Sequence, residues 1–322
     1  MKEPSTPAFS GLLALSRRAL VAVACSFLMV ATAASARAEL LSDWNLLVET
    51  DMATSSHVDG SAKVGGNLSA SAGVFSMHGV TDPGGAGLAV GGNITGNLQI
   101  NNGGNLLLGG TNSGSVLFNG GGTTTAEPGL AVQVTADFLY LDSLSSTLAS
   151  LTPNGTLDGA GNLNATPTLL DGQLVAIYDL NAASFSGLGQ LNLNFGSADT
   201  VILNVSGAPS GSISFVAPPN MIGGFSQSNS SRILWNLYDA TSVTVNNSFN
   251  GAMLAPEADL QVLGGGMNGT VAVHSLSNQN AEIRRFTYSG YLPPVVPVPE
   301  PSSFVLAGLA AVVLGTWRWR RR

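Results

Sequence analysis

Short apolar runs separated by Gly-Gly-Asn corners constrain the fold of this chain more than any other feature. The triplet occurs at residues 65–67, 91–93 and 103–105, each time beside a run in which apolar and polar residues alternate. Strands this short are not stable alone, whereas stacked coils bury a continuous apolar interior. Two later Asn-Gly corners, at Asn250 and Asn268, are 268 − 250 = 18 positions apart, a suitable length for one coil. The pattern predicts a mainly β protein, a right-handed β-solenoid (discontinuous β-helix).

One segment in the middle of the chain has a different period. Between residues 130 and 151 apolar side chains recur every three or four positions, which places them on one face of a helix. Pro128 before the segment and Thr-Pro-Asn-Gly at 152–155 after it are suitable start and stop signals. We therefore expect one long α-helix on the flank of the coils. Asp137 and Asp142 are expected on its solvated face.

Strand-like runs stand on both sides of this helix. The domain is expected to open with a short strand over residues 43–48, and β-rich runs follow the helix at 174–178, 191–195, 200–205 and 212–216. Together with the corners, these runs predict one domain over residues 39–292.

The amino end has the composition of a secretory signal peptide. Arg17 and Arg18 form a basic flank, residues 19–34 an apolar core, and Ala36 and Ala38 frame a small-x-small cleavage site. Residues 1–38 are thus predicted to form a signal helix that engages the secretory translocon and is removed. The only cysteine, Cys25, lies inside this segment, so the mature chain must be stable without disulfides.

The carboxyl end has three parts in a fixed order. A Pro-rich linker at 293–297 leads to an extended Val-Pro-Glu-Pro-Ser segment, an apolar segment at 304–317 and a cluster of arginines. We expect a short transmembrane helix at 303–317 whose arginines stay at the cytoplasmic face. Fourteen residues at ~1.5 Å each reach only about 21 Å, less than a ~30 Å hydrocarbon core, so this span is marginal as a permanent anchor. The residues assigned to these roles are Val298, Pro299, Glu300, Pro301 and Ser302 for sorting, and Arg318, Arg320, Arg321 and Arg322 for the membrane stop.

This tail resembles the PEP-CTERM sorting signal of Gram-negative bacteria. The resemblance covers residues 298–322 and includes the Pro-Glu-Pro triplet, the short span and the terminal arginines. It implies an exosortase-type sorting enzyme as partner, a transient stay in the inner membrane, and transfer to the cell surface or extracellular matrix. An ordinary tail-anchoring helix is the alternative.

The domain between the two ends resembles the choice-of-anchor A family. The matching features are the opening Trp44-Asn45, the Val-Asp-Gly-x-x-x-Val-Gly-Gly-Asn run at 58–67 and Ile-Leu-Trp-Asn at 233–236. The last motif, followed by Phe-Asn-Gly-x-x-Leu-Ala, is also similar to bacterial ice-binding β-solenoids. The first resemblance implies an adhesive surface module without catalytic residues, and the second implies a fold. A regular Thr-x-Thr ladder, which ice binding would favour, is missing from the sequence.

Charge and residue spacing exclude several classes of function. Residues 39–295 carry 4 basic and 17 acidic side chains, a balance of 4 − 17 = −13, which repels nucleic acid and anionic headgroups. The three histidines lack metal-ligand spacing and no Gly-x-Ser-x-Gly elbow joins a strand to a helix, so we predict no enzyme, no metal and no cofactor. Lys63, the only lysine in this part of the chain, is expected to be solvated.

The sequence therefore predicts an exported structural or adhesive protein associated with exopolysaccharide or biofilm matrix. Two other classes stay open. A polysaccharide-active solenoid enzyme would need clustered carboxylates on one wall, such as Glu257 and Asp259, which are two apart. An ice-binding protein would need a flat, threonine-lined face.

Overall fold

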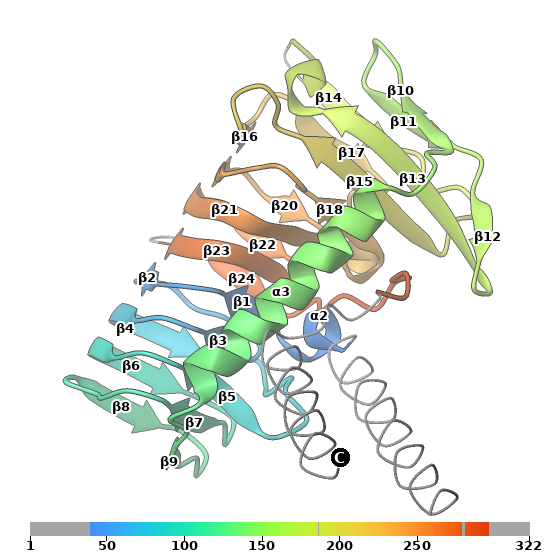
Figure 1. The fold of residues 1–322 in the computed structure, drawn as a ribbon. Helices are drawn as coiled ribbons and strands as arrows, with labels where there is room; N and C mark the ends of the chain where they lie inside the picture. Colours follow the sequence, from blue (N-terminus) through green and yellow to red (C-terminus); the bar gives the residue numbers. More distant parts are fainter. Residues whose placement is uncertain (1–38, 186, 279–280, 296–322) are drawn as a thin grey trace, which may run out of the picture. The chain divides into compact units, whose positions relative to one another are not determined.

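The computed structural model describes residues 39–295, apart from 186 and 279–280. Strands from successive coils pair in parallel and form three walls around a common interior (Figure 1). Each complete coil runs through the three walls in the same order. The mainly β prediction is confirmed.

We call the first wall the α3 wall, because the long helix α3 lies on it. Its strands, in spatial order, are β13 (Gln173–Asn181), β15 (Thr200–Ser206), β18 (Ile233–Asn236), the first half of β21 (Ala252–Gly264), the first half of β23 (Val271–Asn278), β1 (Leu46–Val48), β3 (Ala62–Val64), β5 (Ala86–Val90), β7 (Asn105–Leu108) and β9 (Thr124–Ala126). A short strand, β12 (Thr168–Leu170), pairs antiparallel with β13 at one end.

The second wall, which we call the polar wall, carries an outward row of polar side chains. Its strands are β16 (Ser212–Phe215), β19 (Ser242–Asn246), the second halves of β21 and β23, β2 (Met52–Thr54) and the first halves of β4 (Leu68–Phe75) and β6 (Ile94–Ile100). The second halves of β4 and β6, and β8 (Ser115–Phe118), continue into the third wall, where Val74 pairs with His57 and Val58 with Ile283. Buried and exposed residues alternate along β4, β16 and the second half of β21, so one face of this wall packs inward.

The third wall closes each coil. It contains a four-stranded sheet of β10 (Gly155–Leu157), β11 (Asn162–Ala165), β14 (Gln190–Leu193) and β17 (Asn220–Gly223), and a three-stranded sheet of β20 (Phe249–Asn250), β22 (Gly266–Asn268) and β24 (Glu282–Arg284). The 3-10 helices η1 (Ala182–Phe185) and η2 (Gln227–Arg232) connect strands here. The predicted 18-residue step is confirmed, because Asn250 pairs with Asn268 in parallel register and accepts a hydrogen bond from its amide nitrogen at 2.9 Å.

The first coil of the chain lies in the middle of the stack. The coils from β1 to β9 extend toward one end, α3 returns along the wall, and the later coils build back until β23 pairs with β1 (Figure 1). At this junction, which we call the seam, Leu46 faces Val271 and Met52 faces Leu276. The amino end of the domain lies at the seam, and the last residues run from there along the α3 wall to β15, where the Tyr291 amide donates to the Thr200 hydroxyl at 2.9 Å.

The helix α3 spans Leu130–Ala149, where the sequence pattern predicts a helix. Its buried face includes Val134, Phe138, Leu141, Leu144 and Leu148, which pack on apolar residues of the α3 wall. A buried amide network also attaches it. Asn236 donates to Asn204 Oδ1 at 2.9 Å and to the Ser145 carbonyl at 2.8 Å, and Asn204 donates to the Leu148 carbonyl at 2.8 Å.

The prediction that Asp137, Asp142 and Lys63 are solvated is wrong. Asp137 is buried and its Oδ2 lies 2.7 Å from Lys63 Nζ, so neither is a free surface charge. The Lys63 ammonium also lies 5.2 Å from the centre of the Trp44 ring. Asp142 points toward the coils and is half-buried, because the apolar period of α3 leaves both aspartates at the margins of its buried face.

Two further details differ from the sequence prediction. Residues 40–43 form a helical turn, α2 (Leu40–Asp43), because Leu40 and Leu41 are buried together there, and the first strand begins at Leu46. The Gly-Gly-Asn triplet at 103–105 also does not stack on the triplets at 65–67 and 91–93. Gly109 and Gly110 stack on Gly91 and Gly92 instead, at the corner between the α3 wall and the polar wall.

Glycine is required at this corner by close backbone approach. A Cβ on Gly91 would lie 2.3 Å from the Gly65 carbonyl oxygen and 2.8 Å from Ala131 Cα at the start of α3. The triplet at 103–105 occupies the opposite corner, where Gly104 lies against Gly87 and Asn105 bonds to Gly85. Local sequence does not distinguish the two corners, because both need small residues.

The interior contains one large apolar cluster. Toward the β16 end it is dominated by rings, with Trp235 stacked 5.2 Å from Phe225 and edge-on 5.4 Å from Phe215. Aromatic pairs in this geometry add to the stabilisation that burial provides. This apolar cluster fills the space between the three walls. The outward side chains of the walls are not part of it.

Candidate functional site

The polar wall carries a shallow open depression of about 590 Å³. Its lining residues come from six adjacent coils and are mostly polar: Asp51, Asn67, Ser69, Thr95, Ser242, Thr244, Asp259, Gln261, Ser275 and Ser277, with Met52, Ala53, Leu68, Leu260 and Leu276 beneath or between them. Met52, Leu68, Leu260 and Leu276 form the floor of the depression and point inward, because the side chains of a β-strand alternate between its two faces. No aromatic side chain lines the depression.

Two columns of outward side chains run along the stack through this depression. Strand register places Ser242, Asp259, Ser275, Asp51, Asn67 and Asn93 in the first column. It places Ser214, Thr244, Gln261, Ser277, Ala53, Ser69 and Thr95 in the second. Neighbouring members stand about 4.8 Å apart, which is the spacing of hydrogen-bonded strands.

The first column is bonded to itself along much of its length. Asp51 Oδ1 accepts from the Asn67 backbone, Asn67 Oδ1 accepts from the Asn93 backbone at 2.9 Å, and Asn93 Oδ1 accepts from Thr111. Ser275 donates to Asp259 Oδ1 at 2.6 Å. These side chains hold neighbouring coils in register, so their hydrogen-bonding capacity is largely used within the protein.

The second column is different. The hydroxyl and amide groups of Ser214, Thr244, Gln261, Ser277, Ser69 and Thr95 form no hydrogen bond to any other part of the described chain. Their donors and acceptors face solvent at the spacing of the strands, except where Ala53 interrupts the column. This column, which we call the free polar column, is the surface best suited to a repetitive, hydroxyl-bearing ligand.

Two carboxylates border the depression. Asp259 and Asp51 are exposed and stand two strands apart in the first column, which corresponds to about 9.5 Å at the ~4.8 Å strand spacing. Glu257 is also exposed, as expected for a residue two positions from Asp259. General acids in glycoside hydrolysis are tuned by burial. These exposed groups lack that environment.

Each of the three histidines contacts a different carboxylate, so they do not form one cluster. His57 Nε2 is 3.1 Å from Glu282, His78 Nδ1 is 2.8 Å from Asp59, and His274 Nδ1 is 2.9 Å from Glu49. Across residues 39–295, with their two small gaps, no group of three His, Cys, Asp or Glu side chains is arranged to hold a metal ion.

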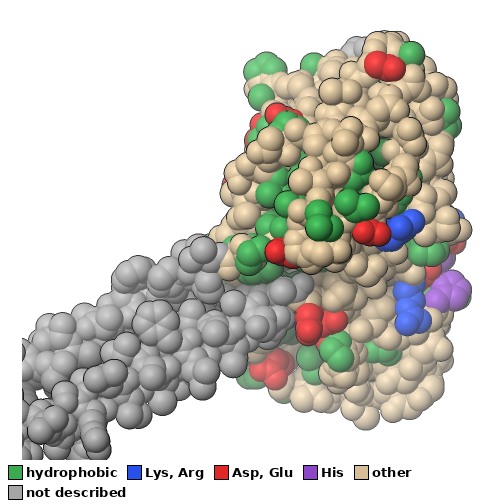
Figure 2. Space-filling view, turned by 90° about the vertical axis from the view of Figure 1, so that its right-hand side faces the viewer, with side chains coloured by type: hydrophobic (Ala, Val, Ile, Leu, Met, Phe, Trp, Pro, Cys, Tyr) green, Lys and Arg blue, Asp and Glu red, His purple; other side chains and the backbone are tan. Residues whose placement is uncertain are grey.

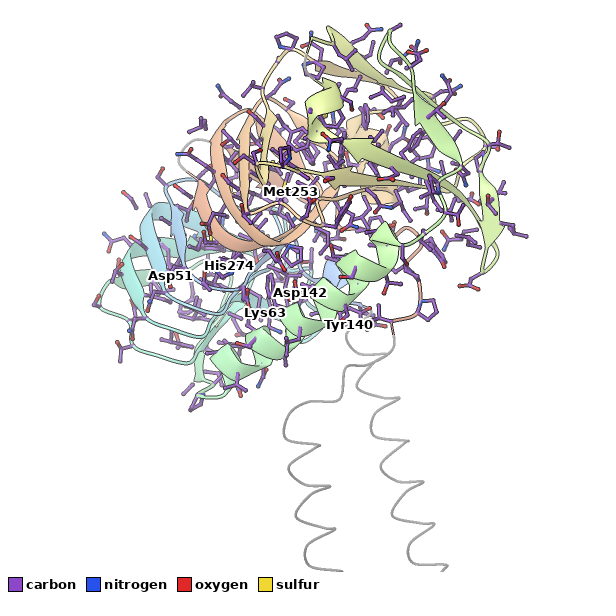
Figure 3. The ribbon with its side chains drawn as sticks, turned by 45° about the horizontal axis from the view of Figure 1, so that its top comes forward. Asp51, Lys63, Tyr140, Asp142, Met253 and His274 are labelled. Carbon is purple, nitrogen blue, oxygen red and sulfur yellow. The ribbon has the colours of Figure 1, made fainter. Side chains whose placement is uncertain are left out.

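A group of ionisable side chains surrounds the seam beneath α3. Burial, with smaller contributions from Glu49 and Glu257, raises the pKa of Asp142 to about 6, while His274 opposes the shift. One carboxylate oxygen of Asp142 is buried without a hydrogen-bond partner in the described chain. Figure 3 shows Asp142 on α3, with His274 and Asp51 on neighbouring coils. Sequence periodicity alone does not reveal this group, because its members come from strands far apart in the chain.

Charged side chains are sparse over the surface as well. Figure 2 shows one face of the molecule on which uncharged polar side chains and backbone predominate and charged groups stand singly or in small groups. The predicted sorting, membrane-stop and cleavage residues lie outside the residues that the structure describes. Within the described part, no helix is both long and apolar enough to cross a bilayer.

Comparison with known families gives two matches. Residues 37–285 match the family described as Putative Ice-binding-like adhesive domain, and residues 297–322 match the PEP-CTERM protein-sorting motif. No curated protein matches the chain.

Three solved structures show the chain's similarity to ice-binding proteins. A glycosylated ice-binding protein from an Arctic yeast is 17% identical with a TM-score of 0.34, covering 81% of this chain and 94% of that one. An ice-binding protein from the Antarctic ascomycete Antarctomyces psychrotrophicus is 13% identical with a TM-score of 0.30, covering 75% and 94%. A domain of an ice-binding protein from Shewanella frigidimarina is 15% identical with a TM-score of 0.28, covering 75% and 95%.

Proposed function

Because the match over residues 37–285 shows that this chain belongs to the ice-binding-like adhesive domain family, we propose that it is a surface adhesin whose polar wall binds a matrix polysaccharide. The PEP-CTERM motif indicates export and a surface or extracellular location. The adhesive family also points to a non-enzymatic protein. The polysaccharide is our own inference, and the free polar column is the observation that carries it.

The free polar column supports this ligand class by its chemistry. Hydroxyl and amide groups repeat every ~4.8 Å along the stack, with one interruption at Ala53, and have no partner within the described chain. An extended polysaccharide presents hydroxyl groups at regular intervals, so it can satisfy several of these groups at once. Weak individual contacts then add up along the polymer.

Matched tryptophan substitutions on two faces test the proposal. Gln261→Trp and Ser69→Trp place bulk on the polar wall, whereas Gln133→Trp and Ser146→Trp place the same bulk on exposed positions of α3. Co-sedimentation with exopolysaccharide from the host culture should fall for the first pair and stay unchanged for the second. Equal binding by all four variants would refute the polar wall as the binding surface.

Ice binding is a second candidate, supported by the family's description. The free polar column contains Ser, Thr, Gln and one Ala, so its hydroxyl groups do not form one uniform flat row. Thermal hysteresis of the mature chain distinguishes the two functions. A hysteresis gap abolished by Gln261→Trp would favour ice as the ligand of the same wall.

The handedness of the coils and the processing of the two ends of the chain are further proposals. We infer right-handed winding, because parallel strands of one sheet are almost always joined by right-handed crossovers. We also infer signal cleavage after Ala38, retention by the terminal arginines, and recognition of the Pro-Glu-Pro triplet by an exosortase-type enzyme. Mass spectrometry of the protein from its host should find a new carboxyl terminus near residues 299–303. Substitution of that triplet by alanine should abolish it, whereas an intact Arg322 in both forms would indicate a simple tail anchor.

A further inference from the structure

The segment near the carboxyl end of the described chain passes the amino end at the seam. The Leu41 carbonyl accepts a hydrogen bond from the Tyr288 amide at 3.1 Å and another from the Thr270 hydroxyl at 2.6 Å. Leu41 is three residues after the predicted signal peptide, and Tyr288 is seven residues before the last described residue, Val295. The amino end therefore leaves at the seam. The carboxyl end continues along the α3 wall to β15, where the Tyr291 amide donates to the Thr200 hydroxyl at 2.9 Å.

This exit point belongs to the α3 wall. Leu40, Leu41, Trp44, Tyr288 and Tyr291 are buried in the same apolar cluster as the inner face of α3, and Leu292 and Val295 pack against that cluster. The Tyr288 hydroxyl donates to the Tyr291 carbonyl at 2.7 Å, which fixes the last turn of the chain against the wall. Figure 1 shows α2, α3 and the segment after β24 on one side of the coils.

The chain between this exit and the tail's apolar segment is short. From Val295 to Phe304 is 304 − 295 = 9 residues, which at ~3.3–3.6 Å each reach at most about 32 Å. While the tail is held in a bilayer, the α3 wall must stay within that distance of the membrane surface.

The outer surface of α3 is compatible with a lipid surface. Its only charged residues, Asp137 and Asp142, are turned toward the coils, where one is ion-paired and the other half-buried. The outward positions are uncharged and include Val132, which is 74% exposed, and Leu139, which is 47% exposed. Glu39 and Asp43 lie at the exit point, so the compatible surface is zwitterionic rather than anionic.

We propose that the outer face of α3 rests against the zwitterionic headgroups of the bilayer in the membrane-held precursor, so that the polar wall faces away from the membrane. This inference rests on the proposed sorting function and extends it. It assigns α3 a role as the membrane-proximal surface, and it means that the free polar column is presented to ligand before the tail is processed.

Single-cysteine labelling of the full precursor tests this orientation. Cys25 is the only cysteine, so Cys25→Ser gives a clean background. One fluorescent donor is then placed at Leu139→Cys or Ser146→Cys on α3, and at Gln261→Cys or Ser69→Cys on the polar wall. Each precursor is reconstituted into phosphatidylcholine and phosphatidylethanolamine vesicles that carry a headgroup-linked acceptor.

The α3 positions should lose more donor emission to the headgroup acceptor than the polar-wall positions. A flexible Gly-Ser insertion after Val295 should remove that difference, because it lengthens the tether. Equal losses on both faces, in precursor that floats with the vesicles, would overturn the orientation alone. A precursor that does not float would overturn the orientation together with the proposed membrane-held stage.

Discussion

Two aspartates on one helix are expected to respond in opposite ways to the same substitution. Asp137 and Asp142 both point from α3 toward the coils, but only Asp137 has a cationic partner, Lys63 at 2.7 Å. Asp142 instead lies near Glu49 and Glu257, and burial raises its pKa from 3.8 to about 6. Asp142→Asn should therefore stabilise the domain at neutral pH, whereas Asp137→Asn should destabilise it.

The magnitude for Asp142 follows from the pKa difference. A rise from 3.8 to about 6 corresponds to about 3 kcal/mol at ~1.36 kcal/mol for each pKa unit. Because the side chain is only half-buried, solvent screening reduces this to about 1–2 kcal/mol. The folded protein binds the proton more tightly than the unfolded chain. The stabilisation is therefore complete below pH 3.8 and is lost as the pH rises through about 6.

Urea unfolding followed by the fluorescence of the buried Trp235 measures both effects. Asp142→Asn should raise the free energy of unfolding by about 1–2 kcal/mol at pH 8 and leave it unchanged at pH 3.5. Asp137→Asn should lower it by roughly 2–4 kcal/mol at pH 8, because Lys63 loses its ionic partner beside Trp44. A loss of stability in Asp142→Asn at pH 8 would refute the reasoning.

Three other substitutions test the packing directly. Asn236→Ala removes the side-chain amide that donates to the backbone of α3 and to Asn204. It should lower the free energy of unfolding by about 2–3 kcal/mol in the same urea assay. A smaller loss than that of an exposed Asn→Ala control would contradict this role. Tyr178→Phe removes a buried hydroxyl that has no hydrogen-bond partner in the described chain. It should raise the free energy of unfolding by up to about 1 kcal/mol. A clear decrease would indicate that the hydroxyl binds a water molecule. Gly91→Ala should lower the thermal midpoint because its Cβ would meet the Gly65 carbonyl, whereas Gly159→Ala, with open space around it, should not.

Local periodicity predicts the elements of this fold but not their order in space. The 18-residue step at Asn250 and Asn268 and the apolar face of α3 follow from side-chain spacing, since both depend on neighbours in sequence. The pairing of Leu46 with Val271 joins residues 225 positions apart, and nothing in either strand specifies its partner. The seam is therefore a property of the whole chain.

The candidate site, too, could be predicted from the sequence only in part. Alternation in β4 and β21 predicts that polar residues such as Ser69 and Gln261 point outward. Their alignment in one free column depends on the seam, because β23 and β2 bring the two halves of the chain together there. The inward direction of Asp142 also could not be predicted, since a residue at the edge of a helical apolar face has no fixed environment until its partner wall is known.

The length of α3 matches the number of coils that the helix covers. The helix contacts strands from β15 to β5, which span six strand spacings or about 29 Å, and its twenty residues rise about 30 Å. One additional coil under the helix would require about three more helical residues, close to one full turn, so the end of its apolar face would be displaced by only about 60°. Duplication of a single coil between these strands is therefore compatible with the helix only when α3 gains about one turn at the same time. Beyond the two ends of α3, coils can be added without any change in the helix.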